Sequence, residues 1–530
     1  MPQSGATDNR RVARNTVFLY IRMIVILLVT LYTSRVILDI LGVEDYGIYN
    51  IVGGVITMFA FLNNSMASST QRYLTYELGR GDPVRIRKVF SAAMHIHIAI
   101  GVLVIVLAET VGLWLLNEKL VIDPDRMNAA RWVYQFSVLT FFVNMIQVPF
   151  NAAIVAHEKM DIFAYVSVAE AVAKLLLVYL LYILPYDKLI LYGVLMFALQ
   201  LGIRTFYQVW CRRNYRECRS GRVGDRGLYR EMTGFAGWNI FGSLAWVMKD
   251  QGVNLLLNLF FGTVVNAARG VALQVSNSVN GFVYNFLYAF NPQITKNYAQ
   301  GNVPEMEKLV LRGLKFSFVL LFFIAFPLLL NINLVLDVWL KEVPEHTSSF
   351  VLLIMADALV CTLFGSPLMT SLSATGKIRN YQIAVSLIIM AGLPAAYLFL
   401  KAGCPPESVY YVTILFSVIA GTVRFFFARA QIGFSARRYL RNVIFRIAVM
   451  LVAAVPLPLF LRIEVFPEDS LLSFLVICTV SVVCTALAAW AAVLDRAERT
   501  ATKKMLKDWL RKAFRRGVKR ENTAGHGQNM

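Results

Sequence analysis

Several charged side chains lie inside stretches that are otherwise apolar enough to cross a membrane. A charge at mid-bilayer costs about 2.5–3.5 kcal/mol on insertion scales, so such a group must pair or face water. Lys249 and Asp250 are adjacent in the sequence. Their side chains diverge by about 100° on a helix and cannot both find partners along it. This spacing favours Lys249 as a substrate-binding cation and Asp250 as an ion-coupling acid.

The other mid-span charges allow two interpretations. Glu170 and Lys174 are four residues apart, as are Arg35 and Asp39. Residues at this spacing share a helix face, so they can form structural ion pairs or face an aqueous cleft together. Asp357 is an isolated acid in the outer half of a predicted span. We take Lys174 and Arg35 as candidate substrate-binding cations, and Glu170 and Asp357 as candidate ion-coupling acids.

Polar side chains form a stripe along one predicted span, over about 80° of the helix circumference. They are Arg269, Asn277, Asn280, Tyr284 and Asn291. An offset of 220 residues maps four of them onto Tyr49, Thr57, Asn64 and Gln71 of an earlier span. Polar stripes facing lipid are costly, so these two should face protein or water. They can serve helix–helix hydrogen bonding alone, or bind substrate through Arg269, Asn277, Asn280, Tyr284 and Asn64.

No catalytic or metal-binding set is evident. His95 and His97 are two residues apart and point to different faces of a helix, so they cannot share a metal. The chain has neither a glycine-rich phosphate loop nor an HExxH motif. Predicted outer loops are short, about a dozen residues at most, which disfavours a glycan polymerase or ligase. We therefore expect a protein that is not an enzyme and that has no cofactor or resident metal.

The elements that hold these residues are predicted membrane helices. Hydrophobic residues make up 58% of the 530-residue chain and charged residues 16%. The apolar residues gather in windows of about 20 or more, the length of a membrane-spanning helix. This pattern predicts an all-α polytopic protein with spans near 17–41, 46–70, 89–116, 130–155, 162–184, 188–210, 235–261, 264–290, 314–336, 348–373, 381–401, 408–429, 440–462 and 470–494.

The basic residues orient these fourteen spans. With a cytoplasmic N-terminus, 37 of the 52 Lys and Arg fall in cytoplasmic segments, 7 in outer loops and 8 inside spans. Lysine and arginine favour cytoplasmic loops, so both termini are predicted to be cytoplasmic. This distribution explains the net charge of +20 without nucleic acid. After the last span, residues 503–516 have the pattern of a basic amphipathic helix on the inner leaflet, followed by a disordered tail.

The two halves of the chain resemble each other at nearly constant offset. A shift of 220 superposes Gly42 on Gly262 and Gly81 on Gly301, and a shift of 218 superposes Pro149 on Pro367. The repeat contains six spans, so both copies enter the membrane from the same side and imply a pseudo-two-fold axis along the membrane normal. The predicted parts are an N-lobe (1–210), a basic linker (211–231), a C-lobe (232–430), two added spans (431–495) and a cytoplasmic tail (496–530).

The stretch Leu41-Gly42-Val43-Glu44-Asp45-Tyr46-Gly47-Ile48-Tyr49-Asn50-Ile51-Val52-Gly53-Gly54 resembles the opening of bacterial polysaccharide repeat-unit flippases of the O-antigen (Wzx) type. These belong to the multidrug/oligosaccharidyl-lipid/polysaccharide (MOP) exporter superfamily. Phe261-Gly262-Thr263-Val264-Val265-Asn266-Ala267-Ala268-Arg269-Gly270 is a second similar stretch. The resemblance implies two six-helix lobes of the MATE-like fold around a cationic cavity. It also implies an alternating-access transporter that moves an undecaprenyl-diphosphate-linked oligosaccharide from the inner to the outer leaflet of the bacterial cytoplasmic membrane.

The sequence is also compatible with other transporters of this superfamily. A multidrug or organic-cation antiporter of the same superfamily would favour an acidic cavity, and a flippase for lipid II is a closer relative. The expected partners are the lipid-linked oligosaccharide and membrane lipids. An H⁺ or Na⁺ counter-ion, a polysaccharide polymerase and glycosyltransferases are further candidates, whereas nucleic acid is not expected.

Overall fold

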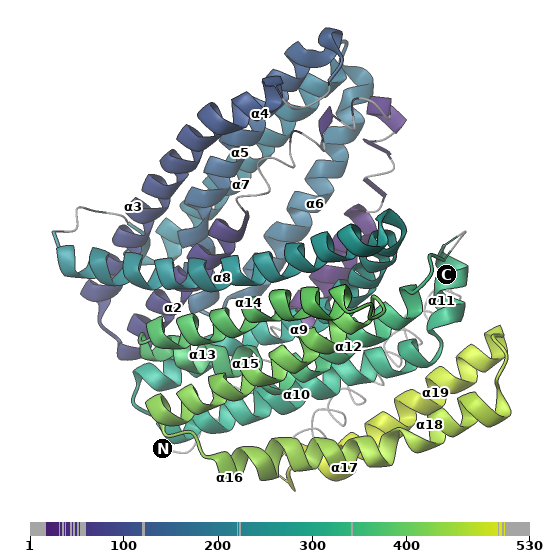
Figure 1. Ribbon diagram of the computed structural model, residues 1–530. Helices are drawn as coiled ribbons and strands as arrows, with labels where there is room; N and C mark the ends of the chain where they lie inside the picture. Colours follow the sequence, from purple (N-terminus) through teal and green to yellow (C-terminus); the bar gives the residue numbers. More distant parts are fainter. Residues whose placement is uncertain are drawn as a thin grey trace, which may run out of the picture. The chain divides into compact units, whose positions relative to one another are not determined.

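The computed structural model describes residues 17–30, 32, 33, 36, 37, 39–42, 45, 48, 49, 52, 60–118, 122–219, 221, 224–340, 343–496, 498–500 and 503. The described residues are almost entirely helical and include no strand. This confirms the all-α class (Figure 1). The predicted Arg35 site and nearly all of the amphipathic tail helix lie outside the described residues.

The chain forms two compact units. Unit 1 comprises Met1–Ser317 and Pro344–Phe434, and unit 2 comprises Phe318–Val343 and Ser435–Met530. Unit 1 contains a helix at Val17–Thr30. Its further helices are α2 (Ala60–Arg80), α3 (Pro83–Leu107), α4 (Leu113–Glu118), α5 (Pro124–Ala156), α6 (Met160–Ile183), α7 (Lys188–Asn214), α8 (Arg226–Phe261), α9 (Thr263–Ala299), α12 (Thr347–Leu363), α13 (Ser366–Thr375), α14 (Arg379–Lys401) and α15 (Ser408–Ile432). Helix α10 (Val303–Leu330) begins in unit 1 and ends in unit 2.

Nine described helices are long and apolar enough to cross a membrane. A tenth span results if α12 and α13, which are bent by 41° at a short break, count as one. The predicted span at 348–373 is therefore a broken span rather than a straight helix. Helices α8 and α9 are long enough to cross a membrane, because at 36 and 37 residues each extends over about 54 Å. They are not counted among the nine because they are less apolar. The spans expected to line a cavity are thus the polar ones.

The backbone repeats at the offsets predicted from the sequence. Gly42 and Gly262 have φ values of +74° and +79°, and Gly81 and Gly301 have +73° and +74°. At the 218-residue offset, Glu158 (φ +58°) corresponds to Gly376 (φ +77°). Non-glycine residues rarely adopt this left-handed conformation, yet Glu158 adopts it at the repeat position of a glycine. The three matched pairs therefore support an internal repeat.

Asp45, which lies in the stretch 41–54 described above, forms an ion pair with Arg126. Arg126 donates hydrogen bonds to both oxygens of Asp45, through Nε at 2.8 Å and through Nη2, and Nη1 donates to Asp187 at 2.7 Å. Burial alone would raise the pKa of Asp187. The amide of Ile190 and the Arg126 guanidinium outweigh this effect and hold the pKa below its ordinary value. The guanidinium therefore ties the start of α5 to Asp45 and to the loop before α7.

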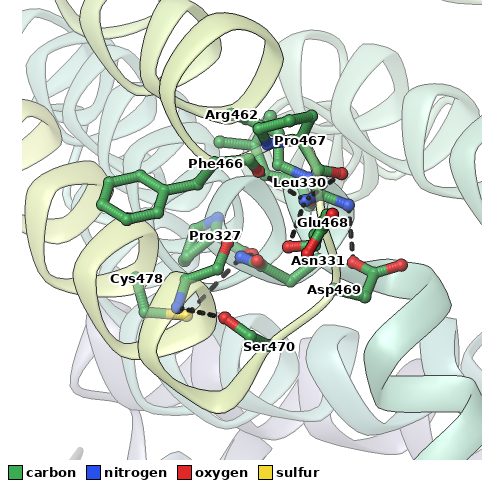
Figure 2. A network of polar contacts seen from close by, with 11 residues as sticks. Pro327, Leu330, Asn331, Arg462, Phe466, Pro467, Glu468, Asp469, Ser470 and Cys478 are labelled. Atoms are coloured by element: carbon green, nitrogen blue, oxygen red, sulfur yellow. Dashed lines mark hydrogen bonds and ion pairs between the residues drawn. The ribbon is translucent and has the colours of Figure 1, made fainter.

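Unit 2 contains the end of α10, α11 (Ile332–Trp339), α16 (Ala436–Tyr439), α17 (Phe445–Ala454), α18 (Pro456–Phe460) and α19 (Leu471–Ala488). Figure 2 shows Arg462 at the turn between the last two predicted spans. Its guanidinium donates to four backbone carbonyls, those of Leu330, Phe466, Pro467 and Glu468, and to the Asp469 carboxylate at 2.5 Å. Arg462 therefore joins this turn to the end of α10, where the predicted span at 314–336 is interrupted.

Candidate functional site

Lys249 lies on α8 and pairs with an acid of another helix. Its Nζ is 3.5 Å from Asp357 Oδ2 on α12 and 4.7 Å from the centre of the Trp246 ring. The two charged side chains are 14% and 15% exposed. Lys249 also lines a small cavity of about 10 Å³, room for one water molecule. The pair is thus largely buried within the second half of the chain.

Arg269 and Asp250 form the second pair. Arg269 Nη2 donates to Asp250 Oδ1 at 2.6 Å and to the Asp250 carbonyl at 2.9 Å. Its side chain is 7% exposed, whereas that of Asp250 is 41% exposed. Adjacent Lys249 and Asp250 therefore bind partners on two different helices, α12 and α9. The carboxylate side of this second pair is the one open to the surroundings.

The third pair lies in the other half of the chain. Lys174 Nζ is 2.8 Å from Glu170 Oε1 on α6, and the side chains are 45% and 24% exposed. Tyr182 donates a hydrogen bond of 2.7 Å to Asp39, the acid that the sequence pairs with Arg35. The predicted charges are therefore distributed over three described ion pairs rather than gathered in one cluster.

The polar stripe on α9 is exposed at two of its five positions, whereas Arg269 is buried and Asn291 is half-buried. Asn277 is exposed, and Tyr284 is 69% exposed. Asn280 is half-buried and donates to the carbonyl and hydroxyl oxygens of Ser276 at 2.9 and 3.1 Å. Gln274 and Ser278, which the sequence prediction did not include, are exposed on the same face. Asn64 of α2, a helix that packs beside α9, is also exposed.

A set of contacts that the prediction missed joins the first and second halves of the chain. Ser65 of α2 and Ser243 of α8 are linked through their hydroxyls at 2.7 Å. Further toward the end of α2, Arg72 donates to the carbonyls of Ser373 at 3.0 Å and Ala374 at 2.8 Å. We name the end of unit 1 at which α2 and α9 terminate the proximal end. Arg72 falls beyond the predicted span 46–70, so the sequence alone places it in a loop and does not indicate this contact.

The described residues include no group of three His, Cys, Asp or Glu side chains arranged to hold a metal ion. The chemistry that the structure presents is instead that of hydrogen bonding and charge. Amide and hydroxyl groups on α2 and α9 can donate to and accept from a polar ligand. The exposed ring of Tyr284 offers an apolar face beside them.

Comparisons with known proteins give a consistent fold. Residues 11–180 match the MatE family model. We found no significant match among curated protein sequences. Solved structures of similar fold include a MATE protein in the straight conformation, with 13% identity over 82% of this chain and 99% of that chain, at a TM-score of 0.70.

Two further structures match at 13% identity over the same shares of the two chains. One is an outward-facing multidrug resistance MATE transporter of the MOP superfamily, with a TM-score of 0.67. The other, with a TM-score of 0.66, is a MOP superfamily transporter from Pyrococcus furiosus whose reversed binding-pocket polarity suggests a different function. The chain is thus a multi-pass membrane protein with the fold of MATE transporters, and this fold together with the MatE match points to a transporter rather than an enzyme.

Proposed function

We propose that this protein is a flippase for a lipid-linked oligosaccharide, working by alternating access between two six-helix lobes. The observation that carries the proposal is the open stripe of uncharged polar groups on α9, Gln274, Asn277 and Ser278, with Tyr284 beside them. Sugars present many hydroxyls and weakly polar ring faces, which amides, hydroxyls and an aromatic ring bind. Lipid cannot hydrogen-bond to such a stripe, so an aqueous space beside it is the better explanation.

The proposal places the proximal end in the cytoplasm, because the predicted loops there hold most of the basic residues. Both termini then lie on the inner face of a bacterial cytoplasmic membrane. The substrate would be an undecaprenyl-diphosphate-linked O-antigen or similar repeat unit. A glycosyltransferase must supply it on the inner face, and a polymerase would consume it outside.

A multidrug or organic-cation antiporter is the alternative from the same superfamily. An organic cation needs a carboxylate whose charge is not already neutralised. In the described structure, each of the three candidate acids has a basic partner: Asp250 with Arg269, Asp357 with Lys249 and Glu170 with Lys174. This pairing leaves none of these three acids free to bind a cationic drug. A lipid II flippase would share these features.

An inside-negative potential favours outward movement of an anion by about 2.3 kcal/mol per charge per 100 mV. A diphosphate of about two charges would gain about twice that amount if no counter-charge moved with it. Protonation or sodium binding at Asp250, Glu170 or Asp357 would change this balance by changing the charge that moves. Lys249, Lys174 and Arg35 would add to the attraction for the diphosphate.

Replacing Asn277 by leucine tests the stripe. The change keeps the number and branching of the side-chain heavy atoms and removes an exposed amide, so we expect normal protein levels and at least a tenfold loss of glycan display at the cell surface. Asn214→Leu is the matched control, since Asn214 is an exposed amide at the end of α7 whose nitrogen donates to the Trp210 carbonyl. Full display in the Asn277→Leu cells would contradict a glycan-binding role for this face.

A further inference from the structure

Arg72 is a buried cation that crosses between the two halves of the chain. Its side chain is on α2 and is 8% exposed. Nε and Nη2 donate to the last carbonyls of α13, those of Ser373 and Ala374, next to Gly376 with its φ of +77°. The ideal position of a Cβ at Gly376 would lie 2.9 Å from Arg72 Nη2. The guanidinium therefore occupies the C-terminal end of a helix, where the helix dipole favours positive charge.

Neighbouring contacts close the same end of unit 1. The Tyr73 ring packs edge-on against Phe235 of α8 at 5.4 Å, and the Tyr73 hydroxyl donates to the Glu231 carbonyl at 3.3 Å. A Cβ at Gly79 would lie 2.8 Å from Ala299 Cβ, so α2 and α9 touch at their ends. We call this set of contacts, made by Arg72, Tyr73 and Gly79, the proximal seam.

The internal repeat supplies a second contact of the same kind. Glu158, at the repeat position of Gly376, is 3.9 Å from Lys296 and accepts from Gln293 at 3.4 Å, both on α9. Each half thus binds the end of a helix in the other half: α2 binds the end of α13, and α9 binds the turn that follows α5. The chemistry differs, however. The α9 contact neutralises a cation with a carboxylate. Arg72 is held by neutral carbonyls and by the Tyr73, Tyr76 and Phe235 rings, 4.4 to 5.2 Å from its guanidinium carbon, and no described carboxylate lies within ion-pair distance of it.

This difference makes Arg72 better suited to exchange partners than the three cations that are paired with acids. Lys249, Arg269 and Lys174 are each neutralised by an acid that an incoming anion must displace. A guanidinium binds phosphate through two parallel charge-assisted hydrogen bonds, which are stronger than bonds to neutral carbonyls. Because Arg72 is buried while the seam is closed, an anion can reach it only after the seam opens.

We infer that Arg72 is a latch that holds the proximal seam closed through the α13 carbonyls and binds the diphosphate of the substrate when the seam is open. This inference rests on the proposed function for the identity of the anion. The diphosphate binds one conformation only, so it shifts the population toward the open seam. Substrate arrival and opening toward the cytoplasm are thereby coupled through one side chain.

A cysteine pair between α2 and α8, about two helical turns from Arg72 along α2, tests this inference. Ser65 and Ser243 have their hydroxyl oxygens 2.7 Å apart, so Ser65→Cys with Ser243→Cys places two thiols in disulfide reach when the halves are together. The full-length protein is oxidised with a membrane-permeant catalyst, and the cross-linked peptide is identified by mass, which separates it from the six native cysteines. Inorganic pyrophosphate is the probe, and sodium chloride at equal ionic strength is the reference.

We expect pyrophosphate to slow cross-linking at least fivefold when Arg72 is present. Adding Arg72→Gln should slow cross-linking without pyrophosphate and remove the response to it. Arg72→Lys should give an intermediate rate, because it keeps the charge but loses the two-pronged geometry. Lys296→Gln is the matched control: it alters the other contact, so the rate should fall while the pyrophosphate response persists.

Three results would overturn the latch. They are an unchanged cross-linking rate in Arg72→Gln, a preserved pyrophosphate response in that variant, and no response in the parent. Glycan transport measured on the same proteins separates this inference from the proposed function. A parent that responds to pyrophosphate through Arg72 but moves no lipid-linked glycan would keep the latch and refute the glycan substrate. Normal glycan transport by Arg72→Gln, without any change in cross-linking, would refute the latch and keep the glycan substrate.

Discussion

Replacing Asp250 by leucine will destabilise the protein more than replacing its partner Arg269 by leucine. The first change leaves a guanidinium that is 7% exposed without its carboxylate, whereas the second leaves a carboxylate that is 41% exposed and can be hydrated. Breaking a fully buried pair costs about 3–5 kcal/mol. We expect about 2–3 kcal/mol for Asp250→Leu, because Arg269 keeps the backbone carbonyl of residue 250 and the Asn254 contact. Denaturant unfolding in detergent measures both variants.

Transport by the double variant then separates structure from function. Arg269→Leu with Asp250→Leu removes both charges and should recover most of the lost stability. We expect it to remain at least a hundredfold impaired in glycan transport, because the headgroup loses the Arg269 guanidinium and keeps only that of Arg72. Parental transport by the double variant would mean that the pair is structural only. Glu170→Leu with Lys174→Leu is the stability control, since that pair is more exposed and should change unfolding by less than about 1 kcal/mol.

Neutralising Lys249 and Arg269 together is expected to abolish glycan display, as the sequence alone suggests. The structure shows that this change also leaves two carboxylates, those of Asp357 and Asp250, without their basic partners. A loss of display in that variant would combine loss of substrate contact with uncompensated negative charge. Removing whole pairs avoids this ambiguity.

Replacing Arg462 by leucine will loosen the turn between the last two spans. Four backbone carbonyls and the Asp469 carboxylate lose their common donor (Figure 2). The side chain is 15% exposed, so water replaces these bonds only in part. We expect the change to lower the free energy of local unfolding by about 3 kcal/mol. Each hydrogen bond to a charged group contributes about 1.5–3 kcal/mol, and water replaces part of that contribution.

Hydrogen exchange measures this effect directly. Amides at residues 328–335 and 461–472 should exchange about a hundredfold faster in Arg462→Leu. Arg462→Lys should recover little, because an ammonium group cannot reach several carbonyls in one plane. Arg441→Leu is the control, as Arg441 is an exposed arginine of the same unit. Unchanged exchange in Arg462→Leu would show that the turn is held by other contacts.

The fold class could be predicted from the sequence because long apolar stretches identify membrane helices. Glycines at 42, 81, 262 and 301 also gave the repeat, and their matched left-handed backbone follows from the same offset. The breaks at Asn331 and between α12 and α13 were not predicted. Both occur where apolarity continues across the break, so a hydropathy pattern does not detect them.

The site was accessible only in part. Adjacency of Lys249 and Asp250 predicted only that they cannot both find partners along their own helix, and in the structure they pair with Asp357 of α12 and Arg269 of α9. That Asp357 and Arg269 are those partners depends on tertiary packing, since Asp357 is more than 100 residues from Lys249. Arg72 escaped notice because its role depends on carbonyls about 300 residues away, which carry no side-chain signature.

Lipid movement by the purified protein tests the central claim most directly. The protein is reconstituted in liposomes that carry a fluorescent undecaprenyl-diphosphate oligosaccharide, and a membrane-impermeant glycosidase reports the fraction exposed outside. We predict that the accessible fraction rises in the presence of the parental protein and stays constant with Asn277→Leu. An unchanged accessible fraction with the parental protein, in liposomes where it does transport a cationic dye, would contradict the account.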